Sequence, residues 1–262
     1  MRVKKFQIES ESLIAQYNKI DDKVEHVRAL MERISPHYLV EFWNQLDVSS
    51  IYHDCALEGE VISPEELNNA LDSRTPTDAT NLAFFTAIRN HKKSFSVGRN
   101  IARQKEIDFT QEFFEKLNML FSPIDTDIEL RGYRKDIPLH RTYFHEISKA
   151  NVITEKMDSL ISWMADISER KTMHPISWAA KAHHKFMRIF PYSDTSGKVG
   201  RMSMNIYLIK NGYLPAIIHS TERQRYYESI KGTSDELIQL IIDSEMAALD
   251  SALRFLHRAV LK

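Results

Sequence analysis

The chain has 262 residues, of which 43% are hydrophobic and 27% charged, and its formal net charge at pH 7 is −1. These values are typical of a protein with one sizeable hydrophobic core, and the near-zero charge argues against a nucleic-acid partner, whose phosphates attract an excess of positive charge. The single cysteine, Cys55, excludes an internal disulfide and a cysteine-rich zinc site.

The N-terminal sequence is too polar for a secretory leader, because Gln7 and Glu9 interrupt it after the first few residues. The longest apolar runs, such as residues 206–209, are much too short to cross a bilayer. We therefore expect a cytoplasmic protein without a membrane partner. The low content of helix breakers, with 7 glycines and 8 prolines, favours a helical fold.

Helical periodicity dominates the first half of the chain, where apolar residues recur three or four positions apart. Ser63 and Pro64 open one of these helices with an N-cap and a first-turn proline, and Glu66 lies three residues after the cap, as in a capping box. The pattern predicts helices over residues 13–34, 39–46 and 49–57, from Ser63, from Thr75, and over residues 110–121.

The periodicity fails between residues 124 and 145 and then returns. Residues 130–139 carry Lys135 and Asp136 between two short, partly apolar arms, which is typical of a small hairpin. Helices are predicted again over residues 153–167, 175–189, 199–211, 223–231 and 235–260. The sequence thus indicates a mainly α fold with one short β element, divided into an N-terminal helical extension (residues 1–44) and a single domain (residues 45–262).

Residues 190–201, with the sequence FPYSDTSGKVGR, lie between two of the long helical patterns. A tight turn with free backbone N–H groups, which opens a helix and is flanked by cations, suits an anion such as a phosphate. A plain helix–helix connection with solvated cations explains the spacing as well. The candidate nucleotide- or phosphate-binding residues are Asp194, Thr195, Ser196, Gly197, Lys198, Gly200 and Arg201.

This loop resembles the signature loop of the Fic family, H-P-F-x-[D/E]-G-N-G-R-x-x-R, whose members mostly transfer AMP from ATP to protein hydroxyls. The resemblance extends over residues 45–231 and is densest after Pro175. The residues that agree with the family in that part are Pro175, Ala179, Ala180, His183, Phe186, Ile189, Pro191, Asp194, Gly197, Arg201, Asn205, Leu208, Gly212 and Tyr227. The resemblance implies a Fic/Fido-type helical bundle with a short β-hairpin flap, a site for ATP or another nucleotide, and Mg²⁺ held by Asp194.

The loop departs from the family pattern at the position of the catalytic base. The family histidine takes the proton from the attacking hydroxyl, and Phe190 stands in its place. Thr195 and Ser196 replace Gly-Asn, and Lys198 replaces the first arginine and with it the bidentate fork. We therefore assign no catalytic residue and expect weak or no AMP transfer.

Residues 54–59 resemble the inhibitory helix of the family, [S/T]-x-x-x-E-[G/N], which we place at about 49–58. Glu58 and Gly59 match, and Asp54 stands at the Ser/Thr position. The resemblance implies a regulatory pair between Glu58 and Arg201 that keeps the γ-phosphate out, whereas the alternative is a solvated charge at a helix end. Residues 130–139 resemble the family flap, which holds a target protein by strand addition; a hairpin that only closes the domain is the alternative.

Three hypotheses about function remain open at this stage. The first is a divergent Fic protein that binds a nucleotide but transfers little or no AMP, and the second is an active transferase that uses another base or another phosphate-containing donor. The third is a protein-interaction module with a relic loop. An apolar stripe on the helix predicted over residues 235–260 allows a homo-oligomer interface, although burial in the core explains it better.

Overall fold

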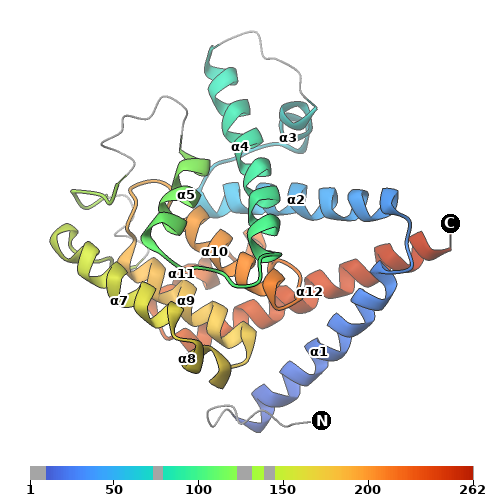
Figure 1. The fold of residues 1–262 in the computed structure, drawn as a ribbon. Coiled ribbons are helices and arrows are strands. Elements are labelled where there is room, and N and C mark those ends of the chain that lie inside the picture. The colour runs from blue at the N-terminus through green and yellow to red at the C-terminus, as the bar shows by residue number, and fades with distance from the viewer. Residues whose placement is uncertain (1–9, 73–78, 123–131, 139–144, 262) are drawn as a thin grey trace.

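The computed structural model describes residues 10–72, 79–122, 132–138 and 145–261, and all regular structure in these ranges is helical (Figure 1). The α-helices are α1 (Glu11–Met31), α2 (Pro36–Glu58), α3 (Pro64–Leu71), α4 (Ala79–Ala102), α5 (Gln111–Phe121), α7 (Ile153–Ala165), α8 (Ile167–Thr172), α9 (Pro175–Ile189), α10 (Ser196–Lys210), α11 (Arg223–Lys231) and α12 (Ser234–Val260), with short 3₁₀ helices η2 (Ala150–Val152) and η3 (Ser220–Glu222). The expectation of a mainly α fold is confirmed.

Local start signals formed helices where the sequence predicted them. At α3, the Ser63 side chain accepts the Glu66 N–H at 3.1 Å, and the Glu66 side chain accepts the Ser63 N–H at 2.8 Å, which is the predicted capping box. Thr110 caps α5 in the same way, by accepting the Phe113 N–H at 3.1 Å. The start predicted at Thr75 lies outside the described residues.

The prediction of two separate helices over residues 39–57 is wrong, because α2 is one helix that runs through both. Asp47 lies in the gap between the two predicted helices, and its carboxylate accepts two hydrogen bonds from Arg99 of α4, at 2.5 and 2.9 Å. A paired carboxylate can face a neighbouring helix and need not end its own. The predicted boundary between residues 44 and 45 therefore falls inside α2, and the division into two parts stays a prediction.

The expected hairpin is not seen, because residues 132–138 contain no strand; residues 130, 131 and 139 lie outside the described part. Arg134 of this segment instead makes several hydrogen bonds to the loop after α9. The Arg134 N–H donates to the Pro191 carbonyl at 2.8 Å, and its Nε donates to the Phe190 carbonyl at 2.7 Å. The segment is thus tied to the loop after α9.

Helix α10 lies in the middle of the molecule, packed against α9, α4 and α5 (Figure 1). All of its residues from 201 to 208 are buried. On one side, Trp178 of α9 stacks between Trp163 of α7 and Tyr207 of α10, with ring centroids 5.4 and 3.9 Å apart. This packing fixes α10 and thereby the position of its first turn.

Helix α12 packs against α1, α9 and α11, which confirms the assignment of its apolar stripe to the core. Helix α1 buries one face against α12 and is joined to α9 by the Tyr17 hydroxyl, which lies 2.6 Å from the Ser177 hydroxyl. Within the described ranges, no helix combines the length and the apolar character that a bilayer-spanning segment requires.

Glu245 of α12 makes folding stability depend on pH. Its Oε1 accepts the Leu214 N–H at 2.9 Å, while Oε2 has no hydrogen-bond partner in the described part of the chain. Burial raises the pKa of this carboxyl to about 8 from its ordinary value of 4.5. Because the folded state then binds a proton that the unfolded state releases, the contribution of Glu245 to stability falls as the pH rises from about 4.5 to about 8.

We expect Glu245→Gln to weaken this pH dependence, because glutamine keeps an acceptor for Leu214 and cannot ionise. Thermal unfolding between pH 6 and 8.5 measures it: the melting temperature of the wild type should fall more steeply than that of the variant. Glu106→Gln, which changes an exposed carboxylate, serves as the control and should follow the wild type. Equal slopes for the wild type and Glu245→Gln would contradict this account.

Candidate functional site

The loop between α9 and α10 is closed by its own side chains. Ser196 Oγ accepts the Tyr192 N–H at 2.8 Å and donates to the Tyr192 carbonyl at 2.7 Å. The Val199 N–H bonds back to the Thr195 carbonyl at 2.9 Å, so the three N–H groups before it have no acceptor within the helix. The first turn of α10 therefore offers backbone donors and the positive end of a helix dipole to an anion.

Phe190, which stands where the family pattern has its base, is a packed residue that ends α9. It is 1% exposed and adopts a left-handed conformation with φ 51°. Its carbonyl accepts from Arg134 Nε, and the His145 ring lies edge-on with its centroid 6.0 Å away. The aromatic ring belongs to the core, and it carries no group that exchanges a proton.

Arg201 lies on α10, one turn after Gly197. Only 3% of its side chain is exposed. Its Nε donates to Asp54 Oδ1 at 2.6 Å, and its Nη2 donates to Glu58 Oε1 at 2.8 Å. Nη1 lies 3.4 Å from the Tyr226 hydroxyl. Burial disfavours the charge, but the two carboxylates outweigh it and hold the pKa of the guanidinium well above its ordinary value. The pair between Glu58 and Arg201 that the family resemblance implied is thus present.

The Glu58 carboxylate lies directly on the first turn of α10. A Cβ atom added to Gly197 would come within 2.0 Å of Glu58 Oε1 and 3.0 Å of Arg201 Nη1. Glycine therefore lets the carboxylate approach the backbone closely. Glu58 can occupy this place because α2 ends directly after it, at Gly59, which has a left-handed φ of 87°. The Glu58 carboxylate thus occupies the place beside the free N–H groups of the first turn of α10, where an external anion would bind.

Lys198, the second cation of the loop, is also neutralised from the end of α2. Its Nζ lies 2.8 Å from Glu60 Oε1. Burial opposes the charge, but Glu60 raises the pKa of the ammonium group above its ordinary value. Residues 54–60 therefore supply a carboxylate partner to each cation of the loop.

The remaining candidate residues are placed differently. Asp194 is exposed at the mouth of the loop, and the Thr195 hydroxyl donates to Asn118 Oδ1 of α5. Gly200 faces α9, where an added Cβ would meet His183 at 2.9 Å and Phe186 at 3.0 Å. The structure thus gives Gly200 a role in helix packing and does not bring it to the anion position.

The candidate Mg²⁺ ligand of the loop is Asp194, and no all-protein metal cage surrounds it in the described part of the chain. Among the described residues, no group of three or more His, Cys, Asp and Glu side chains surrounds a metal position. Mg²⁺ in nucleotide sites takes most of its ligands from phosphate and water and one or two from carboxylates. The exposed carboxylate of Asp194, close to the backbone donors of α10, is suited to this arrangement.

Sequence reasoning missed several residues that complete the site. Asp54 was noted only as a replacement, although it lies four residues before Glu58 and so on the same face of α2. His91 of α4 places its Nε2 3.1 Å from Asp54 Oδ2, and the Tyr226 hydroxyl bridges His183 and Arg201. Nothing in the sequence around His91 or Tyr226 indicates these contacts, which join helices far apart in the chain.

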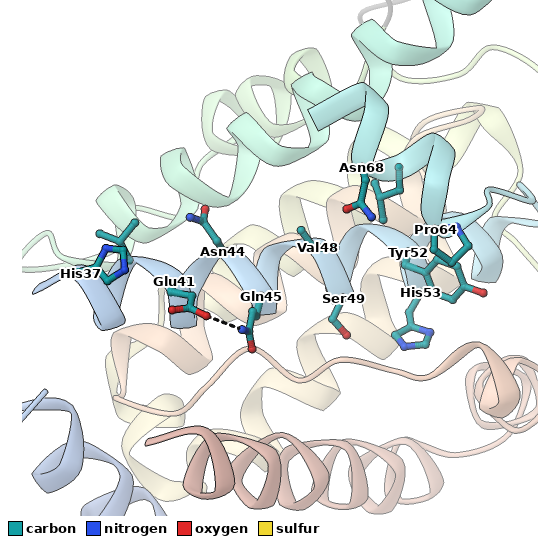
Figure 2. Close-up of a pocket in the computed structure, with 12 residues that line it drawn as sticks. His37, Glu41, Asn44, Gln45, Val48, Ser49, Tyr52, His53, Pro64 and Asn68 are labelled. Atoms are coloured by element: carbon teal, nitrogen blue, oxygen red, sulfur yellow. Dashed lines mark hydrogen bonds between the residues drawn. The ribbon is translucent and has the colours of Figure 1, made fainter. Parts of the chain in front are cut away.

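A groove of about 850 Å³ runs along α2 and α3 (Figure 2). Its lining extends from His37 to Asn68 and includes none of residues 190–201. The candidate site is instead a cluster of charged side chains, in which Glu58 and Arg201 are each only 3% exposed.

Comparison with known proteins identifies the domain. Residues 101–208 match the Fic/DOC family. Curated relatives include the protein adenylyltransferase Fic of Aedes aegypti, which is 23% identical over 210 residues (78% of this chain and 41% of the relative). The same protein of Drosophila melanogaster is 25% identical over 207 residues (76% of this chain and 41% of the relative). The chain thus spans about two fifths of the length of these relatives.

Solved structures share the fold. A Fic-domain-containing signalling protein from Bacteroides thetaiotaomicron has a TM-score of 0.75 at 18% identity and covers 90% of this chain and 97% of its own. A fragment of Fic-1 from C. elegans has a TM-score of 0.75 at 18% identity and covers 94% of this chain and 74% of its own. Residues 101–208 thus match the Fic/DOC family, and the chain shares its fold with solved Fic-domain structures.

Proposed function

We propose that this chain is an autoinhibited nucleotide-binding Fic protein with weak or no protein AMP-transfer activity. The observation that carries the proposal is the Glu58 carboxylate on the first turn of α10, bonded to Arg201. A carboxylate in that position supports a phosphate site there, because a phosphate would accept hydrogen bonds from the same donors. Because Glu58 and a phosphate would use the same donors, they compete.

The donor that we propose is ATP, because the curated relatives are named protein adenylyltransferases. When bound, Mg²⁺ would neutralise phosphate charge, and Asp194 would hold it. Backbone donors of α10 and the Arg201 guanidinium would hold the phosphate oxygens. The proposed setting is the cytoplasm, where ATP and Mg²⁺ are abundant and the buried thiol of Cys55 stays reduced.

Weak transfer follows from the absence of a proton acceptor at Phe190. A general base contributes about two to four orders of magnitude to such a reaction. The neighbouring His145 is 3% exposed, and its Nε2 lies 2.9 Å from the Met187 carbonyl. His183 is buried against Tyr226, and burial together with Arg201 lowers its pKa to about 3. Neither buried imidazole is placed to meet an incoming hydroxyl.

We further propose that a target protein docks beside residues 132–138. Arg134 ties this segment to the carbonyls of Phe190 and Ser148, so it lies against the loop where a substrate hydroxyl would arrive. An extended peptide could pair with backbone groups of this segment, as in other cases of strand addition.

A second candidate function is an active transferase with a different base or a different phosphate-containing donor. The intact pair between Glu58 and Arg201 favours it, because an inhibitory contact matters most where there is activity to inhibit. The two candidates share the nucleotide site and differ in turnover.

We expect Glu58→Ala to strengthen binding of ATP with Mg²⁺ about tenfold or more, because the competing carboxylate leaves the anion position. Arg201→Ala should weaken binding in the same background by a similar factor. Isothermal titration calorimetry measures both. Glu41→Ala, which removes a carboxylate from α2 far from the loop, is the matched control and should bind as the wild type does. Absence of heat in every variant would contradict nucleotide binding and favour an interaction module with a relic loop.

We expect Phe190→His to restore only weak self-labelling by radiolabelled ATP, even in the Glu58→Ala background. Histidine tolerates the left-handed conformation better than most side chains, so the backbone can stay as it is. Lys198 and Thr195 still differ from the arginine and glycine that the family has in its phosphate-binding turn, however. Phe190→Ala is the control for loss of the ring and should give no labelling. Efficient labelling by the unaltered protein would contradict weak transfer and support the second candidate.

A further inference from the structure

The Asp54 carboxylate joins three helices at the site. It belongs to α2, its Oδ1 accepts from Arg201 Nε of α10 at 2.6 Å, and its Oδ2 lies 3.1 Å from His91 Nε2 of α4. Because an ionised carboxylate can only accept hydrogen bonds, His91 Nε2 carries the proton in this contact. Both oxygens of Asp54 are therefore engaged by groups that come from other helices.

Asp54 is ionised in the cluster that it forms with Arg201 and His91. Burial opposes its ionisation, but Arg201 and His91 outweigh burial and hold the pKa of the carboxyl well below its ordinary range. Burial lowers the pKa of His91, although Asp54 opposes this shift. A neutral imidazole thus donates to a charged carboxylate, which in turn faces a charged guanidinium.

Asp54 and Glu58 hold different parts of the same guanidinium. Asp54 takes Nε, close to the stem of the side chain, whereas Glu58 takes the terminal Nη2 and lies on Gly197. Departure of Glu58 would free the terminal nitrogen and the backbone donors of α10. It would leave Nε bonded to Asp54, with the planar group still held in place.

We propose that Asp54 is a positioning residue for phosphate binding, which holds Arg201 through Nε so that its terminal nitrogens face the first turn of α10. His91 fixes the second oxygen of Asp54 and thereby its orientation. This inference rests on the proposed nucleotide site. It gives Asp54 and Glu58 opposite effects on binding, although both form ion pairs with Arg201: Glu58 competes with the ligand, and Asp54 supports it.

The test compares variants in the Glu58→Ala background by calorimetry with ATP and Mg²⁺. Asp54→Ala should lower the affinity about ten- to a hundredfold, because a charge-assisted hydrogen bond that orients the guanidinium is lost. Asp54→Asn keeps an acceptor for Nε and should lose clearly less. It also keeps the inference testable if Asp54→Ala does not fold, which thermal unfolding and circular dichroism would reveal.

Asp47→Ala is the matched control. Asp47 is another buried carboxylate of α2, and it pairs with Arg99 of α4 in two hydrogen bonds. Its loss should lower the melting temperature and leave ATP affinity within about threefold of the parent, because Arg201 keeps its partner. An equal loss of affinity in Asp47→Ala and Asp54→Ala would assign the effect to helix docking and overturn the inference.

The remaining outcomes separate this inference from the proposed function. Where the Glu58→Ala parent binds ATP and its Asp54→Ala derivative binds equally well or more tightly, Asp54 is a second inhibitory group, and only the inference is overturned. Where the parent binds no ATP at all, the proposed nucleotide site is overturned and the inference with it.

Discussion

The rest of the site depends on one buried charge, the guanidinium of Arg201. A buried cation is costly unless carboxylates or other acceptors surround it closely. Both carboxylates that meet it come from the last two turns of α2, at Asp54 and Glu58. The ion pairs of Arg201 therefore link the end of α2 to the start of α10, whose position is set by its packing against α9, α4 and α5.

The same charge explains why the site is closed. A helix start with free N–H groups and a nearby arginine attracts any anion, and Glu58 lies on this helix start because α2 ends beside it at Gly59. Lys198 finds its partner in Glu60 on the same segment. The Glu58 carboxylate thus occupies the place next to these donors, and under the proposed function an external phosphate would have to displace it.

Local signals predicted most of the helices, whereas long-range contacts decided the exceptions. The bounds of α9 and α11 agree with the sequence because the helical periodicity lies within each segment. The break expected inside α2 failed because Asp47 meets an arginine 52 residues away, and the hairpin failed because Arg134 bonds to the loop after α9. The pair of Glu58 and Arg201 was predictable from the family pattern, but the support from His91 was not. His91 of α4 and Asp54 of α2 lie on separate helices, and no sequence spacing indicates that they meet.

The groups that would bind an anion and the position of the missing base lie on two different helices. The first lie at the start of α10, and the second lies at the end of α9. Anion binding belongs to the first turn of α10, where Gly197 and Arg201 keep the geometry that it needs. Proton transfer would belong to the last turn of α9, where Phe190 has become part of the core. An imidazole in its place would need polar partners in a site lined by aromatic rings and carbonyl groups. Under the proposed function, loss of the base would therefore weaken turnover and leave the phosphate-binding groups of α10 in place.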